Sequence, residues 1–349
     1  MRKIRALFFL IILLYLFLLP VNAESFEAPD VPNSGSAYMP DTIDSFGEGL
    51  WYVIRSAISV IHPSIQQALT LCAAMMAIAL ISSLIHCVSS KAERTLQIAT
   101  AAGIGVLLLQ TTNAMVSLGT NTVTTISEYG KLLIPVLTTV LAAQGYFNTS
   151  TALYTGTTLF ATVLTNVIVK LIIPLIYIFI CLCITNSALG ENLLKKMQDF
   201  TKWLITWTLK MILYIFTGYI SITGVVSGSA DASMVKATKL TISGAVPVVG
   251  SILSDASESL LVSAGVMKST VGIYGVLAIM ATFIYPFLRI GVQYLLLKLT
   301  AAACNVIGTQ SVSDLLHGFA TAMGFILAIV SSISLLLVIG VVCVMKGVT

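Results

Sequence analysis

Charge is what this sequence lacks most: only 9% of its 349 residues are Asp, Glu, Lys or Arg, whereas soluble domains carry about 25% charged residues. Hydrophobic residues make up 57% of the chain and gather into runs long enough to cross a bilayer. So little charge excludes an aqueous globule. The sequence predicts an all-α polytopic integral membrane protein with about seven to nine transmembrane or re-entrant helices.

Residue clusters that carry chemistry are also scarce. The three histidines are scattered, and the six cysteines lie in or beside apolar runs. The closest pair, Cys181 and Cys183, lacks the spacing common in zinc sites, so both are interpreted as small hydrophobic side chains. Neither a Walker-type phosphate loop nor a basic run interleaved with aromatics occurs. We therefore expect no enzyme activity, catalytic residue, metal, cofactor or nucleic-acid partner.

The first segment, residues 1–23, has the layout of a signal peptide. Arg2, Lys3 and Arg5 precede an apolar core, which at about 14 residues is short for a span of about 20. The following Val-Asn-Ala predicts cleavage after Ala23, which would place the new N-terminus outside the cytosol. An uncleaved anchor helix is the alternative.

Three further regions are predicted beyond the signal peptide. Residues 24–49 carry six acidic residues, no basic residue and three prolines, so we expect an extended, extracytosolic acidic tail. Residues 50–67 are amphipathic, and Trp51 and Tyr52 suit the interface between water and lipid. Residues 68–349 are assigned to a polytopic helical membrane domain.

Apolar runs separated by polar segments define the predicted spans of this domain. Whole crossings are predicted over 68–88, 96–118, 203–226, 270–288, 291–307 and 319–345. The run 132–145 is short and contains Pro135, so it is either a short crossing or a re-entrant helix. Residues 152–189 form either one bent helix or two short helices.

Basic residues between the spans predict their orientation. Lys91 and Arg94 follow the first span, and the segment 191–202 carries three lysines. Because cytosolic loops are enriched in Lys and Arg, both segments are assigned to the cytosol. Two separate crossings between residues 270 and 307 then return Lys346 to the cytosolic side.

The stretch AVPVVGSILSDASESLLVSAG lies in a segment of about 240–265 that is too broken to cross a membrane. Pro247 and Gly250 interrupt its first arm, and Asp255 and Glu258 have the spacing of a capping box before the second. Arms of about ten residues cannot cross a hydrocarbon core of about 30 Å. This predicts a re-entrant or interfacial hairpin, either lining a pore, docking a partner, or merely capping a helix at the membrane surface.

Four basic residues lie within or at the ends of apolar runs. An ionisable side chain at the bilayer centre costs at least about 2.5–3.5 kcal/mol, so it normally faces a bundle interior or water. Lys210 and Arg289 are expected to reach the interface with their long side chains. Lys170, four residues before Pro174, and Lys298 are the candidates for a channel or partner contact.

Three stretches carry a family resemblance. AVPVVGSILSDASESLLVSAGVMKSTVGIYGVLAI, PFLRIGVQYLLLKLTAAAC and FATAMGFILAIVSSISLLL resemble the stage III sporulation protein AE family, most firmly over 145–346. The resemblance implies a non-enzymatic component of the multiprotein channel connecting mother cell and forespore in endospore-forming bacteria. It also implies a multi-pass protein of the cell membrane, located in the mother-cell-derived outer forespore membrane and required for forespore development after engulfment.

The partners implied by this resemblance are the other stage III A sporulation proteins, including a cytosolic ATPase, and the forespore protein Q across the intermembrane space. The lipid bilayer is a further partner, and a homo-oligomer stays open. Two other functions fit the residues. The chain could be an autonomous secondary permease for a small solute, using proline-broken helices and buried lysines, or a passive membrane scaffold.

Overall fold

The computed structural model describes residues 28–40, 45–88, 93–143, 147–189, 193–222, 270–307 and 310–346. Helices make up nearly all of these residues, and six of the described helical segments are long and apolar enough to cross a bilayer. The predicted all-α, polytopic membrane class is confirmed. The signal peptide with its cleavage site after Ala23, and the predicted hairpin at 240–265, lie outside the described residues.

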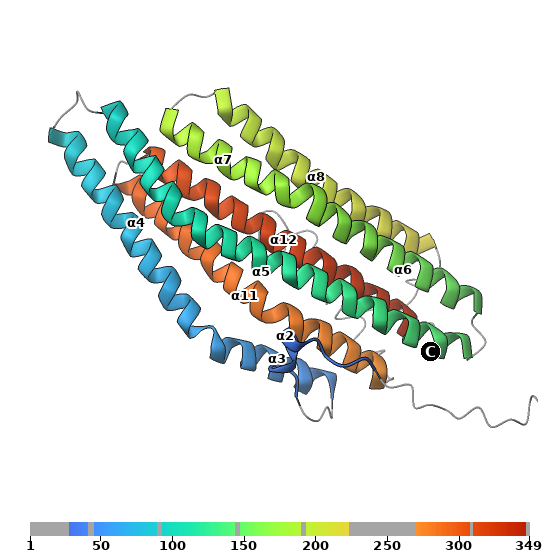
Figure 1. Cartoon of the computed structure of the whole chain (residues 1–349). Helices are drawn as coiled ribbons and strands as arrows, with labels where there is room; N and C mark the ends of the chain where they lie inside the picture. Colours follow the sequence, from blue (N-terminus) through green and yellow to red (C-terminus); the bar gives the residue numbers. More distant parts are fainter. Residues whose placement is uncertain are drawn as a thin grey trace, which may run out of the picture.

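The helices run alongside one another in an elongated antiparallel bundle (Figure 1). They are α2 (Asn33–Ser36), α3 (Phe46–Val60), α4 (His62–Val88), α5 (Glu93–Ala143), α6 (Phe147–Val167), a π-helical segment (Ile168–Ile172), α7 (Ile173–Leu189), α8 (Leu193–Ile222), α11 (Thr270–Val306) and α12 (Gln310–Lys346). The chain passes from α4 to α5, from α7 to α8 and from α11 to α12 at one end of the bundle. Arg94, Lys195 and Lys196 belong to the first turns there, so we call it the basic end, and the opposite end the far end.

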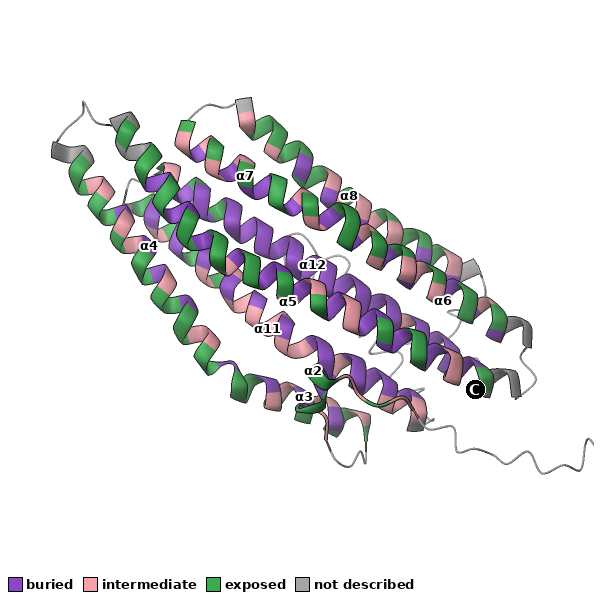
Figure 2. Ribbon diagram, in the orientation of Figure 1, coloured by how far each residue is buried: buried purple, intermediate pink, exposed green. Residues whose placement is uncertain are grey.

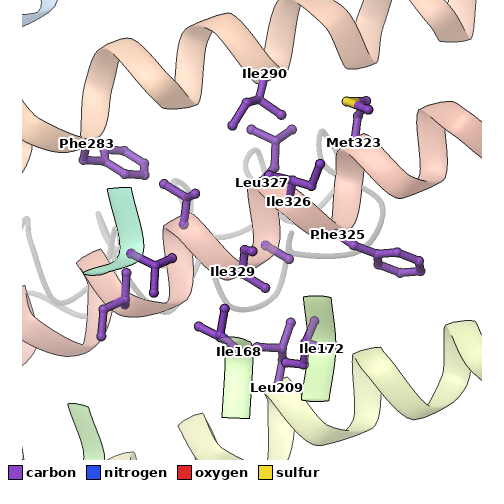
Figure 3. Packing of buried hydrophobic residues seen from close by; sticks show 14 of the residues in the cluster. Ile168, Ile172, Leu209, Phe283, Ile290, Met323, Phe325, Ile326, Leu327 and Ile329 are labelled. Atoms are coloured by element: carbon purple, nitrogen blue, oxygen red, sulfur yellow. The ribbon is translucent and has the colours of Figure 1, made fainter. Parts of the chain in front are cut away.

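Helix α12 forms the centre of the bundle. In its membrane-spanning window 94% of the residues are buried, against 22% to 56% for the other five helices (Figure 2). Phe325 packs edge-to-face on Phe179 of α7 with ring centroids 5.3 Å apart. Figure 3 shows Ile168 and Leu209 approaching α12 from one side and α11 residues from the other. Helix α12 is therefore surrounded by other helices, whereas each outer helix keeps a face exposed.

Two buried serines in the middle of α12 do not disrupt it, because each bonds to its own helix. Ser332 donates its hydroxyl to the carbonyl of Ala328 at 2.6 Å, and Ser334 donates to Val330 at 3.0 Å. Such bonds to the carbonyl four residues earlier satisfy a hydroxyl that would otherwise be costly to bury.

The predicted alternatives for 152–189 resolve to one continuous helix with a widened turn. Pro174 has no N–H, and its ring crowds the carbonyl four residues earlier, that of Lys170. The turn expands into the π segment over Ile168–Ile172, where the N–H of Ile173 bonds to the carbonyl of Ile168. The proline therefore widens the helix rather than ending it.

Helix α5 joins what the sequence divides into a span, a polar loop and the short run 132–145. The threonines of the polar part donate to carbonyls of their own helix, Thr120 to Val116 at 2.8 Å and Thr122 to Leu118 at 2.7 Å. This threonine-rich segment, although its composition is typical of a loop, is therefore helical. The helix continues through Pro135, and the re-entrant alternative for 132–145 is wrong.

Helix α11 likewise replaces two predicted crossings, 270–288 and 291–307, with a single helix through Pro286. Neighbouring helices can satisfy the backbone groups that a proline frees within a membrane. Because this segment crosses once rather than twice, every later segment lies on the opposite side from the one predicted. Helix α12 therefore runs to the far end, and the prediction that Lys346 shares a side with Lys195 and Lys196 is wrong (Figure 1).

The N-terminal segment lies against α11 instead of extending away over residues 28–40. Tyr38 stacks on Tyr285 with ring centroids 5.7 Å apart. A Cβ added to Gly35 would lie 2.9 Å from the backbone nitrogen of Thr282. Burial, and then the neighbouring Tyr285, raise the pKa of the Tyr38 phenol above its usual value, so Tyr38 stays neutral in this contact.

The amphipathic helix α3 begins at Phe46 rather than at residue 50. Ser45 caps it, its hydroxyl accepting from the N–H of Glu48 at 3.3 Å. Val53 and Ala57 are buried, whereas Trp51 stays 65% exposed. One face of α3 therefore packs on α11, and its aromatic face stays free, as an interfacial helix requires.

Candidate functional site

Of the predicted site residues, those that the structure describes do not all lie in one place. Lys170 lies in the π segment and Pro174 just after it, and both are exposed. Lys298 is half-buried on α11 and lies about 12 Å from the basic end, measured along the helix. Lys170 lies about 28 Å from the same end along α7 and the π segment. The four predicted hairpin residues, Pro247, Gly250, Asp255 and Glu258, lie outside the described residues.

A polar hollow at the basic end is the candidate site nearest to Lys298. This basic-end pocket, about 500 Å³ in volume, is enclosed by α7, the start of α8 and the start of α12. Its charged and polar lining includes Asn186, Lys195, Gln198, Asp199, Lys202, Gln310, Asp314 and His317. Cations and carboxylates therefore face one small volume.

His317 connects Lys298 to this pocket. The Lys298 Nζ lies 3.5 Å from the His317 Nδ1 and 6.0 Å from the centroid of the Tyr294 ring. Because α11 and α12 are antiparallel and meet at the basic end, residues at matched distances from their turn lie side by side. Lys298 thereby adds a third amine beside the two lysines of the pocket, Lys195 and Lys202.

The floor of the pocket is fixed by polar contacts between helices. Ser187 of α7 donates to the carbonyl of Ser311 on α12 at 2.7 Å, and Gln198 of α8 donates to the Cys183 sulfur at 2.6 Å. The Oδ1 of Asn186 is buried and has no hydrogen-bond partner within the described residues. An unsatisfied buried acceptor of this kind favours a guest that brings a donor.

The mixed charges of the basic-end pocket suit the recognition of a partner. Among the residues that the structure describes, no group of three or more His, Cys, Asp and Glu side chains could hold a metal ion. Lysines and aspartates of mixed sign suit a polar protein segment, because paired charges fix orientation and register more than they add affinity.

Fold and site together define a class: a polytopic helical membrane protein with a charged pocket at one end. The family model described as stage III sporulation protein AE matches residues 39–348. The chain belongs to the stage III sporulation protein AE family.

A curated relative extends this finding. Stage III sporulation protein AE of Bacillus subtilis (strain 168) is 23% identical over 232 residues, which cover 66% of this chain and 58% of the relative. The chain thus aligns with less than two thirds of the relative's length. No solved structure matches the chain.

Proposed function

We propose that this protein is a non-enzymatic membrane component of the multiprotein channel that connects mother cell and forespore during endospore formation. The observation that carries the proposal is membership of a stage III sporulation family over residues 39–348. The proposed location is the mother-cell-derived outer forespore membrane. The proposed partners are the other stage III A proteins, with their cytosolic ATPase, and the forespore protein Q.

The dimensions of the bundle support a role between two membranes. Helix α5 has 51 residues and is about 76 Å long, whereas a hydrocarbon core is about 30 Å thick. Toward the far end, α5 exposes Asn121, Glu128 and Lys131. A polar surface of this kind suits water, so the far end is proposed to project into the intermembrane space.

The basic-end pocket is proposed to receive a cytosolic partner of the channel. Its position beside the Lys-rich start of α8 supports this, because the positive-inside rule assigns that segment to the cytosol. The exposed Lys170 is proposed as a second contact, with a partner or another copy of the chain, since it lies on the surface of the bundle.

Deletion of the gene in its spore-forming host tests the channel role. Forespores are expected to complete engulfment and then collapse, or fail to activate a late forespore-specific reporter, as seen by microscopy. The native gene should restore both. Normal spores from the deletion strain, where it holds no second copy of the gene, would contradict the proposal and favour the solute permease, which predicts uptake by the purified protein alone in liposomes.

The pocket is tested by complementation with Lys298→Glu. The expected result is normal abundance in the membrane with loss of sporulation, because a carboxylate beside His317 reverses the charge of the contact. Arg55→Glu is the matched control, a charge reversal at an exposed position on α3. Equal sporulation with both variants would exclude the pocket as a required contact.

A further inference from the structure

A second hollow opens between α4, α5 and α11, about halfway along the bundle. This glutamine groove has a volume of about 970 Å³ and is partly open to the outside. Figure 1 shows α4 running apart from α5 toward its connection with α3. The polar side chains lining the groove include Gln66, Gln67, Thr70, Gln110, Arg289 and Gln293. Such a density of amides is costly among membrane spans unless the groups are bonded.

Gln293 indicates that the groove is incomplete as it stands. This side chain is only 5% exposed, it lines the groove, and its Nε2 has no hydrogen-bond partner within the described residues. A buried donor without a partner carries its full desolvation cost. A bound group that offers an acceptor oxygen would remove that cost.

The charge of the groove specifies the kind of acceptor. Arg289 lines it, and none of the described lining residues is acidic. The sequence predicts that Arg289 reaches toward the interface, and the structure places it in a hollow with amide and hydroxyl groups around it. A guanidinium presents its N–H groups in a fork that fits phosphate oxygens. The groove is therefore complementary to a single anionic oxygen-bearing group.

Depth and apolar walls indicate that this group belongs to a lipid. Arg289 lies about 26 Å along α11 from the basic end, close to the thickness of a hydrocarbon core of about 30 Å. Beside the polar residues the groove is lined by Leu71 and Ala74, which lie on the side nearer the basic end and suit acyl chains, and by Ala114 and Met115. A free phosphate would gain nothing from these walls.

We propose that the glutamine groove binds an anionic phospholipid of the leaflet nearer the far end, with its phosphodiester against Arg289 and Gln293 and its acyl chains along α4. The lipid would fill the space between α4 and α5 and hold α4 in place. This inference does not depend on the channel role.

The test is the thermal stability of the purified full chain in detergent, with dioleoyl-phosphatidylglycerol, dioleoylglycerol or inorganic phosphate added. Phosphatidylglycerol is expected to raise the Tm of the native chain and of Lys210→Leu, a control on α8 that is absent from the groove lining. Arg289→Leu and Gln293→Leu should weaken phosphatidylglycerol binding about tenfold or more, which is the range for one charged or buried hydrogen bond. Arg289→Lys should retain part of the binding.

The Tm of Gln293→Leu without added lipid also distinguishes lipid binding from a purely structural role of Gln293. Without added lipid its Tm should be no lower than that of the native chain, because the variant removes an unpartnered buried amide. Should it fail to fold, Gln110→Leu, which lines the groove at an exposed position, replaces it in the comparison of phosphatidylglycerol binding. The proposal is overturned by equal shifts in Arg289→Leu and Lys210→Leu, by an equal shift with dioleoylglycerol, or by inorganic phosphate reproducing the full effect.

Discussion

Gly35 controls how the N-terminal segment docks, because the backbone of α11 passes directly against it. A Cβ at Gly35 would meet the Thr282 hydroxyl at 2.6 Å and its backbone nitrogen at 2.9 Å. Helix backbone cannot yield as a side chain can, so Gly35→Ala should detach residues 28–40. Limited proteolysis of the purified protein is expected to cleave this segment several-fold faster.

Gly47→Ala is the matched control, because nothing lies within 4 Å of a Cβ at that position. Replacing glycine with alanine inside a helix stabilises it by roughly 0.5–1 kcal/mol. The control should therefore leave proteolysis unchanged or slower. Equal cleavage of both variants would mean that the contact with Thr282 does not hold the segment.

At the level of single residues, the sequence reveals part of the candidate site. It singles out Lys298, since a lysine inside an apolar run is costly and visible without any fold. It does not reveal His317 as the neighbour, because that pairing arises only when α11 and α12 fold back on each other. Gln293 also escapes notice, because an uncharged amide in a sequence gives no sign that its burial will leave it without a hydrogen-bond partner.

Among the helices, the π segment behaves as a single inserted residue. A π turn holds one more residue than an α turn at the same place. Deleting Val169 together with Pro174→Ala should restore a regular helix and keep both flanking faces in register. We expect the protein to reach the membrane at near-native abundance and elute as a single peak on size exclusion.

Deletion of Ile178, an exposed residue in the regular part of α7, is the comparison. It should rotate the rest of α7 by about 100° and turn Phe179 and Cys183 out of their contacts with α12. Loss of the protein is expected in that case. A Val169 deletion as damaging as the Ile178 deletion would contradict the description of the π segment as an insertion.

Element boundaries show why sequence reasoning succeeds on class but not on topology. Apolar runs identify membrane helices correctly, because lipid leaves few other structures available. Threonines and prolines in α5 and α11 nevertheless indicate breaks that do not form. Hydroxyls bond back to their own helix, as in Thr138 to Ile134 at 2.8 Å, and packing on neighbouring helices maintains the rest.

For the molecule as a whole, polar residues on separate helices mark one level of the bundle. Gln110, Lys170, Lys210 and Arg289 each lie about 26–28 Å along their helices from the basic end. Exposed side chains nearer that end include Leu84, Ile98 and Leu299. Exposed hydrophobic side chains such as Leu132 and Leu159 also lie beyond this level, so the bundle is expected to cross the bilayer with its basic end and its far end on opposite sides.

This placement predicts labelling from one side only. In a variant without native cysteines, Glu128→Cys should react with a membrane-impermeant maleimide in cells whose outer surface is accessible, whereas Lys196→Cys should react only after permeabilisation. A fusion following Thr349 should report the same side as position 128. A fusion on the side of Lys196 would contradict the single crossing of α11 and restore the topology that the sequence predicts.

The burial of α12 has a consequence for biogenesis. The ribosome makes this helix after the five helices that surround it, so they must insert first and keep a slot open while synthesis continues. During that interval the slot faces lipid or an insertion factor, and the contacts of Phe179 and Leu209 with α12 are unmade. A chain interrupted before residue 310 would therefore be an inserted but unfinished protein, and membrane quality-control proteases should recognise it through its open centre.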